Sequence, residues 1–155
     1  MIKISRLTDY AIVLLSQMVA GSKSVFSASD LAERSSLPLP TTSKILKKLA
    51  KNGIVSALRG AAGGYRLERP AGAISIAAII EAMDGPISIT DCADPAPKRE
   101  TCRIKSICPM SANWGSVNRV VRAALEEVSL TDMLADSRGD FEDIFASAPE
   151  LRKRA

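Results

Sequence analysis

The chain has 155 residues, of which 46% are hydrophobic and 25% are charged, an ordinary composition for a globular protein. It contains no histidine, which excludes catalytic triads, histidine acid–base catalysis and histidine-ligated metal sites. The aromatic content of 4% argues against a base-stacking platform, and no apolar run is long enough to span a bilayer. We therefore expect a cytoplasmic protein made of one small domain and an extension.

The charge is unevenly distributed along the chain. Residues 1–70 contain 11 Lys and Arg against 4 Asp and Glu, whereas residues 71–155 contain 10 against 13. A basic first half joined to a mildly acidic second half indicates a polyanion-binding module with a separate regulatory or assembly part. Uneven but solvated surface charge is the competing interpretation of the same numbers.

Three segments of the first half have the pattern of amphipathic helices. The first runs over residues 8–19 and stops at Gly21, and the second opens at the capping box Ser27–Asp30. The third begins near Pro40, which is tolerated in a first helical turn, and ends at Asn52 and Gly53.

A hairpin is predicted next, with strands at 54–58 and 65–67 around a glycine-rich tip, followed by a helix from Ser75 to Asp84. Three helices and a hairpin in this order are typical of a winged helix-turn-helix. The fold class is therefore mainly α with a small β-hairpin, and residues 1–84 form its domain.

The remaining chain divides into three further parts. Residues 85–109 form a proline-containing loop that carries all three cysteines, residues 110–135 are predicted to be one long helix, and residues 136–155 a flexible tail. One face of the long helix is apolar and cannot be buried by the helix alone, so we expect it to pack on another subunit. Its members are Trp114, Val117, Val121, Ala124, Leu125 and Val128.

The third helix and the hairpin tip have the residues expected of a DNA-binding surface. Short polar side chains early in the helix can approach base edges, lysines can face phosphates, and an arginine at the tip can enter the minor groove. A solvated basic helix face is the alternative. The residues we expect to bind DNA are Pro40, Thr41, Thr42, Ser43, Lys44, Lys47, Lys48, Arg59 and Gly60.

The three cysteines are a candidate metal or redox site. Cys92, Cys102 and Cys108 lie within 17 residues of a loop with little periodicity. In a cytosolic chain, thiols so placed favour an iron–sulfur cluster, structural zinc or redox chemistry over a stable disulfide. Three unrelated buried cysteines are the competing interpretation. A cluster would need a fourth ligand: an oxygen, a small thiol or a residue of a partner chain.

The segments ISRLTDYAIVLL, LAERSSLPLPTTSKILKKLAKNGIV, RGAAGGYRL and ISIAAIIEAMDGPI, followed by three cysteines, resemble the IscR-like regulators over residues 1–134. The stretch CPMSANW resembles the branch that regulates the SUF iron–sulfur assembly system. The resemblance implies a homodimeric winged-helix repressor that binds palindromic double-stranded DNA. It also implies that the three cysteines bind a [2Fe–2S] or [4Fe–4S] cluster, that Pro40–Lys48 lies on the recognition helix, that Arg59 is the wing arginine, and that residues 111–128 form the dimerisation helix.

Two positions depart from the namesake of that family. Ser111 stands where the namesake has a histidine ligand, so the fourth ligand does not carry over. In nitric-oxide-sensing relatives an aspartate of the other subunit completes the cluster, and Asp9 occupies that position here, although a helix N-terminus favours aspartate anyway. Ser43 stands where the namesake has a glutamate that tunes base preference, so operator specificity does not carry over either.

We therefore predict an iron–sulfur-sensing repressor of SUF genes that acts as a homodimer and has no enzymatic or membrane role. The alternative that keeps the DNA-binding part is a zinc- or thiol-redox-responsive regulator without a cluster. An electron carrier or cluster scaffold is a rival of another class, against which the basic helix and the wing argue. An enzyme is the least favoured, because no paired carboxylates, phosphate loop or nucleophile–base pair appears.

Overall fold

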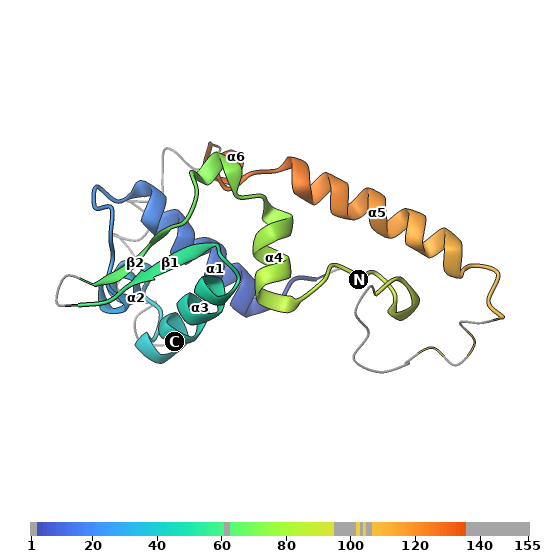
Figure 1. Cartoon of the computed structure of the whole chain (residues 1–155), viewed down its shortest axis with the longest axis horizontal. Coiled ribbons are helices and arrows are strands. Elements are labelled where there is room, and N and C mark those ends of the chain that lie inside the picture. Colours follow the sequence, from blue (N-terminus) through green and yellow to red (C-terminus); the bar gives the residue numbers. More distant parts are fainter. Residues whose placement is uncertain (1–2, 61–62, 95–101, 103, 105–106, 136–155) are drawn as a thin grey trace.

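The computed structural model describes residues 3–60, 63–94, 102, 104 and 107–135, so the predicted tail lies outside the described residues. The described part is mostly helical with a two-stranded antiparallel hairpin, as predicted (Figure 1). Its elements are α1 (Arg6–Ala20), α2 (Ala28–Ser35), α3 (Leu39–Lys51), β1 (Val55–Leu58), β2 (Gly64–Leu67), η1 (Ala71–Ala73), α4 (Ile76–Asp84), η2 (Asp91–Ala93), α5 (Ser111–Glu127) and α6 (Leu130–Ala135). In this part of the chain, no helix combines the length and hydropathy needed to cross a membrane.

Local sequence signals explain where the first helices begin and end. The Ser27 hydroxyl accepts from the Asp30 N–H while the Asp30 carboxylate accepts from the Ser27 N–H, so the predicted capping box opens α2. Gly21 caps α1 and Asn52 caps α3. The helix-starting residue of α1 is Ser5 rather than Thr8, because the Ser5 side chain accepts from the Thr8 N–H.

The hairpin pairs Val55 with Leu67 and Leu58 with Gly64. A third, single-residue strand at Phe26 joins its edge through mutual backbone hydrogen bonds with Tyr65 of 2.9 and 2.8 Å. This close approach requires glycine at position 64, because a Cβ there would lie 2.5 Å from the Phe26 carbonyl oxygen. The wing is therefore fastened to the chain between α1 and α2.

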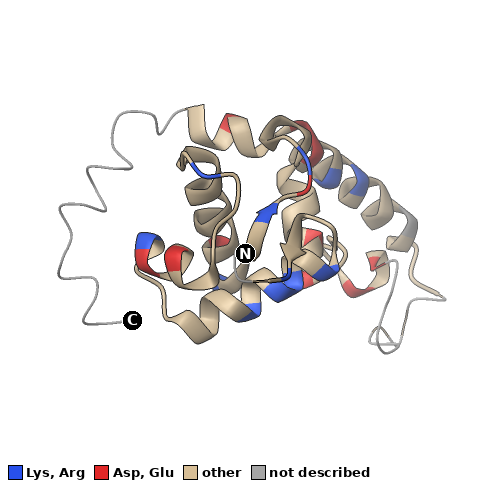
Figure 2. Cartoon of the chain, turned by 60° about the vertical axis from the view of Figure 1, so that its left-hand side comes forward, with Lys and Arg blue, Asp and Glu red and all other residues tan. Residues whose placement is uncertain are grey.

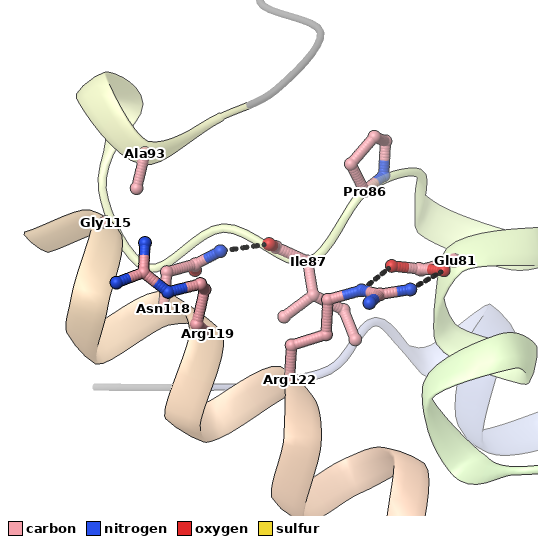
Figure 3. Close-up of a pocket in the computed structure, with 8 residues that line it drawn as sticks. All are labelled: Glu81, Pro86, Ile87, Ala93, Gly115, Asn118, Arg119 and Arg122. Atoms are coloured by element: carbon pink, nitrogen blue, oxygen red, sulfur yellow. Dashed lines mark hydrogen bonds and ion pairs between the residues drawn. The ribbon is translucent and has the colours of Figure 1, made fainter.

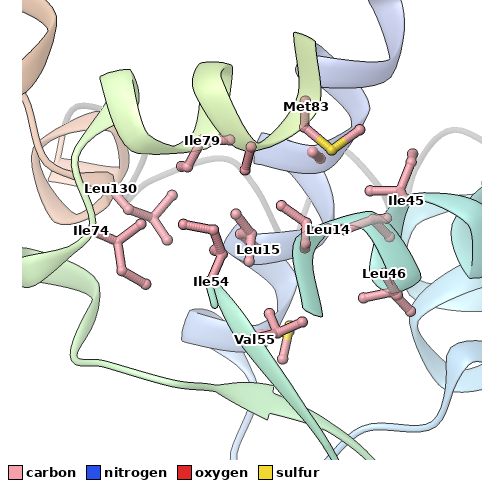
Figure 4. Close-up of a cluster of buried hydrophobic side chains, with 14 of the residues drawn as sticks. Leu14, Leu15, Ile45, Leu46, Ile54, Val55, Ile74, Ile79, Met83 and Leu130 are labelled. Atoms are coloured by element: carbon pink, nitrogen blue, oxygen red, sulfur yellow. The ribbon is translucent and has the colours of Figure 1, made fainter. Parts of the chain in front are cut away.

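One apolar cluster forms the core of the winged-helix part (Figure 4). It combines Leu14 and Leu15 of α1 with side chains of α2, α3, β1 and α4. Leu130 of α6 is also fully buried in it, although the chain has by then passed through α5. Residues 130–135 therefore belong to the winged-helix core in space.

The predicted single helix over 110–135 is wrong at one point, because the chain breaks between α5 and α6. Ile76 N–H donates to the Val128 carbonyl and Leu130 N–H to the Ile74 carbonyl, each at 2.8 Å, so Val128 and Ser129 form an extended link before α6. Ser129 and Asp132 then exchange hydrogen bonds in a capping box that opens α6. That signal stands in the sequence as Ser-x-x-Asp and outweighs the apolar periodicity.

Candidate nucleic-acid interface and cysteine loop

Helix α3 presents a polar, basic face to solvent. Its core side consists of Ile45, Leu46 and Leu49, each 0% exposed. Pro40, Lys44 and Lys47 are exposed on the opposite side, and Thr41 and Ser43 are half-buried at its flanks. The helix carries lysines and no acidic residue, so its solvent face is positively charged (Figure 2). This face has the size and charge needed to lie against a polyanion.

Thr42 does not belong to that face, and its expected contact with DNA is wrong. Its side chain is 0% exposed, and its position three, four and seven residues before Ile45, Leu46 and Leu49 places it on the core stripe of α3. Its hydroxyl is buried without a hydrogen-bond partner among the described residues. The spacing of Thr42 relative to the apolar residues of α3 already indicates burial, but a polar residue type favours an exposed position.

Lys48 also differs from the other lysines of α3. Its ammonium group donates a hydrogen bond to the Met83 carbonyl, at the end of α4. Asn52 donates to the neighbouring Ala82 carbonyl at 3.1 Å. Both contacts join the end of α3 to the end of α4, and no local pattern in the chain predicts them.

The tip of the hairpin carries the predicted wing arginine. Arg59 and Gly60 are both exposed, and Gly60 has a φ of +109°, a conformation that favours glycine. Residues 61–62 of the tip lie outside the described residues. Where the chain turns back, a Cβ at Gly63 would lie 2.4 Å from the Leu58 carbonyl oxygen, so a side chain there would distort the turn. The tip thus offers Arg59 to a ligand beside the basic face of α3.

The three cysteines lie on the connection between α4 and α5. Each is half-buried and none is in a disulfide. Cys92 lies in η2, which packs against α5, and its sulfur is 3.3 Å from the Thr90 hydroxyl. Cys108 lies just before α5, where its carbonyl accepts from the Ser111 hydroxyl at 3.2 Å. Ser111, in the position of the namesake's histidine, is therefore the first residue of α5, and its hydroxyl is hydrogen-bonded to the preceding turn.

The structure does not bring these thiols together into a site. Among the described residues, no group of three or more Cys, Asp and Glu side chains is close enough to hold one metal ion. The donor chemistry nevertheless fits an iron–sulfur cluster, because three unpaired thiols lie on one loop. Asp9, the proposed fourth ligand, is exposed in the first turn of α1.

Polar side chains hold the loop and α4 against α5 (Figure 3). Asn118 is 9% exposed; its amide donates to the Ile87 carbonyl at 2.9 Å and accepts from the Ile89 N–H at 3.0 Å. Arg122 binds Glu81 of α4 through two hydrogen bonds, which raise the pKa of Arg122. A pocket of about 630 Å³ lies between these contacts and Ala93 of η2.

Beside these contacts, α5 leaves apolar side chains uncovered. Trp114, Val117 and Val120 are 40%, 44% and 69% exposed. Val120 was not among the residues predicted for this stripe. Leu125 was, but it packs against the winged-helix core of its own chain. The exposed stripe is thus narrower at the C-terminal end of α5 than the sequence indicates.

Comparison with known proteins identifies this arrangement. The family model described as Rrf2, iron-dependent transcriptional regulator, matches residues 4–136. The chain belongs to the Rrf2 family. The match covers α3, the wing, the cysteine connection and α5, so all of these are parts of the Rrf2 domain rather than additions to it.

Named relatives agree with this placement. The HTH-type transcriptional regulator IscR of Xenorhabdus nematophila is 32% identical over 106 residues, which are 68% of this chain and 62% of that regulator. The chain therefore spans less than two thirds of the length of that Rrf2 relative.

Two solved structures share the fold. CymR of B. subtilis, titled the global cysteine regulator, has a TM-score of 0.62 at 24% identity, with 87% of this chain and 98% of that chain covered. IscR of T. potens has a TM-score of 0.61 at 24% identity, with 88% of each chain covered. The predicted IscR-like winged-helix fold is therefore confirmed, and it is a fold common to Rrf2 regulators with different names.

Proposed function

We propose that this Rrf2 protein is a DNA-binding repressor that responds to an iron–sulfur cluster and regulates iron–sulfur assembly genes of the SUF type. The observation that carries the proposal is the placement of three unpaired thiols on the connection between α4 and α5, in a chain whose α3 presents a basic face. The thiols supply the ligand chemistry, and α3 with the wing supplies the DNA-binding surface.

On the DNA side, Pro40, Thr41 and Ser43 approach base edges in the major groove, while Lys44 and Lys47 contact phosphates. Arg59, with Gly60 beside it, enters the adjacent minor groove. Two copies of the chain must place their α3 helices about 34–36 Å apart to bind successive half-sites of a palindrome. Pairing through the exposed stripe of α5 would set that separation.

On the sensing side, Cys92, Cys102 and Cys108 would hold the cluster, and Asp9 of the partner subunit would complete its ligands. When bound, the cluster supplies a labile link between the loop and α1 of the partner. Without that link, under iron limitation or oxidative stress, the loop would no longer be tied to α1 of the partner, and the hold of α3 on the operator would weaken. Asp9 is suited to a ligand role across the dimer because its carboxylate is exposed in its own chain.

The first experiment is anaerobic purification with iron, sulfide, zinc and visible absorption measured on one sample. The proposal predicts visible charge-transfer bands and matching iron and sulfide, which Cys92→Ala, Cys102→Ala and Cys108→Ala each abolish. Thr90→Ala is the matched control, since it removes the hydroxyl beside Cys92 without removing a thiol. A colourless protein that also fails reconstitution would contradict the proposal.

The DNA side is tested separately by the salt dependence of binding to the promoter of the SUF genes. Lys44→Ala and Lys47→Ala should each reduce the slope of log affinity against log salt by about one. Lys23→Ala is the control, because Lys23 is an exposed lysine outside α3. Unchanged slopes for both α3 variants would remove this surface from the proposal and leave the thiol chemistry unaffected.

A second function is favoured by the half-buried, separate thiols. Three free cysteines, with no preformed metal group among the residues that the structure describes, also suit a regulator that responds to zinc or to thiol oxidation. The same sample distinguishes the two functions. Stoichiometric zinc, or a reversible loss of free thiols with no iron and no sulfide, would favour this second function over the cluster sensor. The proposed DNA-binding surface would be unaffected.

A further inference from the structure

The end of α4 is joined to α1 by a group of hydrogen bonds centred on Asp84. The Asp84 carboxylate accepts from the Ser5 N–H at 3.3 Å, the Ser5 hydroxyl at 2.8 Å and the Thr8 hydroxyl at 2.7 Å. Thr8 is 0% exposed, so Asp84 satisfies a hydroxyl that water does not reach. One carboxylate thus fixes the first turn of α1 on the last turn of α4.

The same turn of α4 is joined to the candidate recognition helix. The carbonyls of a last helical turn have no partner within their own helix. Two of these carbonyls, at Ala82 and Met83, accept hydrogen bonds from Asn52 and Lys48 at the end of α3. Three consecutive residues of α4, 82–84, therefore hold α3 on one side and α1 on the other.

The cysteine loop begins at this point. After Asp84 the chain turns at Gly85, whose φ is +96°, and residues 87–89 are fixed to α5 by Asn118. Cys92 follows Asp84 by eight residues. Cys92 is therefore joined to Asp84 by a short segment that Asn118 holds against α5.

We infer that the end of α4 is the joint through which the state of the cysteine loop reaches α3, with Asp84 and Asn52 as its positioning residues. The inference rests on the proposed function and adds residues that touch neither the thiols nor DNA. If Asp84 moves, either its hydrogen bonds to α1 break, or the whole last turn of α4 moves, including the Ala82 and Met83 carbonyls. In the second case the end of α3 shifts, because it is hydrogen-bonded to those carbonyls.

The test compares Asp84→Ala and Asn52→Ala with two controls matched in charge and type. Glu33→Ala removes an equal charge at an exposed residue of α2, and Asn113→Ala removes an exposed amide of α5. Affinity is measured for a DNA fragment selected from a random library with the wild-type protein, and for random DNA. Each is measured with cluster-loaded and metal-free protein, and thermal unfolding checks the fold.

Coupling between two sites typically changes affinity about 5–150-fold, and we expect the wild type to show such a ratio between loaded and metal-free protein. Asp84→Ala and Asn52→Ala should reduce that ratio to below about threefold, while random-DNA binding and cluster content stay unchanged. The controls should keep the full ratio. Wild-type ratios in both joint variants would overturn the inference and leave the proposed function standing.

Hydrogen exchange gives a readout that does not depend on a cluster. In metal-free protein, Asp84→Ala should speed amide exchange in residues 48–51 of α3, which the Asp84 side chain does not contact. Unchanged exchange there would overturn the joint even if the wild type shows no cluster response. Should Asp84→Ala fail to fold, Asp84→Asn retains an acceptor oxygen for Ser5 and is tested in the same way.

Discussion

The winged-helix part and α5 of this molecule differ in what completes them. The first buries a continuous apolar cluster to which α1, α2, α3, β1, α4 and α6 all contribute. In α5, Asn118 is the only buried side chain among those described, and Trp114, Val117 and Val120 remain exposed. The first part is therefore held by its own chain, whereas α5 keeps an exposed apolar side.

The two regions also differ in how they are held. Apolar burial stabilises the winged-helix part, which leaves its elements few alternative positions. Helix α5 is held on the connection after α4 by Asn118, on α4 by the Arg122–Glu81 pair, and on the winged-helix core by Leu125. Exposed ion pairs of this kind contribute little to stability, so these contacts orient α5 but stabilise its position only weakly.

The comparison is most strongly tested at Leu130, the residue that assigns α6 to the winged-helix core. Leu130→Ala should lower the free energy of unfolding by about 2–5 kcal/mol, because it leaves a cavity in a fully buried position. Val120→Ala, at a 69% exposed position of α5, should change it by less than about 0.5 kcal/mol. Denaturant unfolding measures both, and equal effects would mean that the two regions do not differ as described.

The exposed side of α5 is tested by Val117→Asp. If two copies pair through this stripe, a charge at its centre should raise the dimer dissociation constant more than about 100-fold, because the charge would be desolvated in the interface. Ala123→Asp introduces the same charge on another exposed face of α5 and should leave dissociation almost unchanged. Sedimentation velocity distinguishes the two variants. A Val117→Asp protein that dimerises normally would place the subunit contact elsewhere.

A smaller effect is expected at Thr42, within the core of α3. Thr42→Val replaces a buried hydroxyl that has no partner with a methyl group of similar shape, and should raise the free energy of unfolding by about 1 kcal/mol. DNA affinity should not change, because the side chain is 0% exposed. Thr41→Val, at the surface flank of the same helix, is the control for stability, because its hydroxyl is not fully buried. A loss of DNA binding in Thr42→Val would restore Thr42 to the DNA-binding set.

The smallest expected effect concerns the capping box that separates α5 from α6. Hydrogen bonds from the Ser129 hydroxyl and N–H lower the pKa of Asp132 below its ordinary value of 3.8. Because the folded-state pKa is depressed, the stabilisation is present above the unfolded value and is lost as the pH falls through the folded value. The stability of Asp132→Asn should therefore fall less than that of the wild type below pH 3.8. Denaturant unfolding at a series of pH values measures both stabilities. If both proteins lose the same stability as the pH falls, the lowered pKa of Asp132 is refuted.

Local signals in the sequence were sufficient for most of the winged-helix part. The capping box at Ser27, the stop at Gly21 and the core spacing of Ile45, Leu46 and Leu49 each act within one helix. Such signals depend on neighbours in the chain, so periodicity and residue type reveal them. The break before α6 was not predicted, although the spacing of Ser129 and Asp132 is typical of a capping box. The apolar periodicity continues on both sides of the break and therefore favoured one continuous helix.

The candidate site was less predictable because its contacts join distant segments. Hydrogen bonds from α3 and from the start of α1 meet at residues 82–84 of α4, and no spacing rule connects Ser5 or Asn52 with residues 30 or more positions away. The burial of Thr42 followed from spacing, but its residue type favoured the surface. The ligand roles of the cysteines and Asp9 stay predictions, since they depend on a group and a second chain that sequence patterns do not supply.

The extended link at Val128–Ser129 constrains the length of α5. One end of the helix is bonded to the winged-helix core, and its other end begins beside Cys108, about 25 Å away at 1.5 Å per residue. Each residue inserted between these ends would turn the apolar stripe by about 100° relative to α3 and move the thiols outward. Changes in the length of α5 therefore keep the orientation of the apolar stripe only in steps that restore the helical phase, such as seven residues.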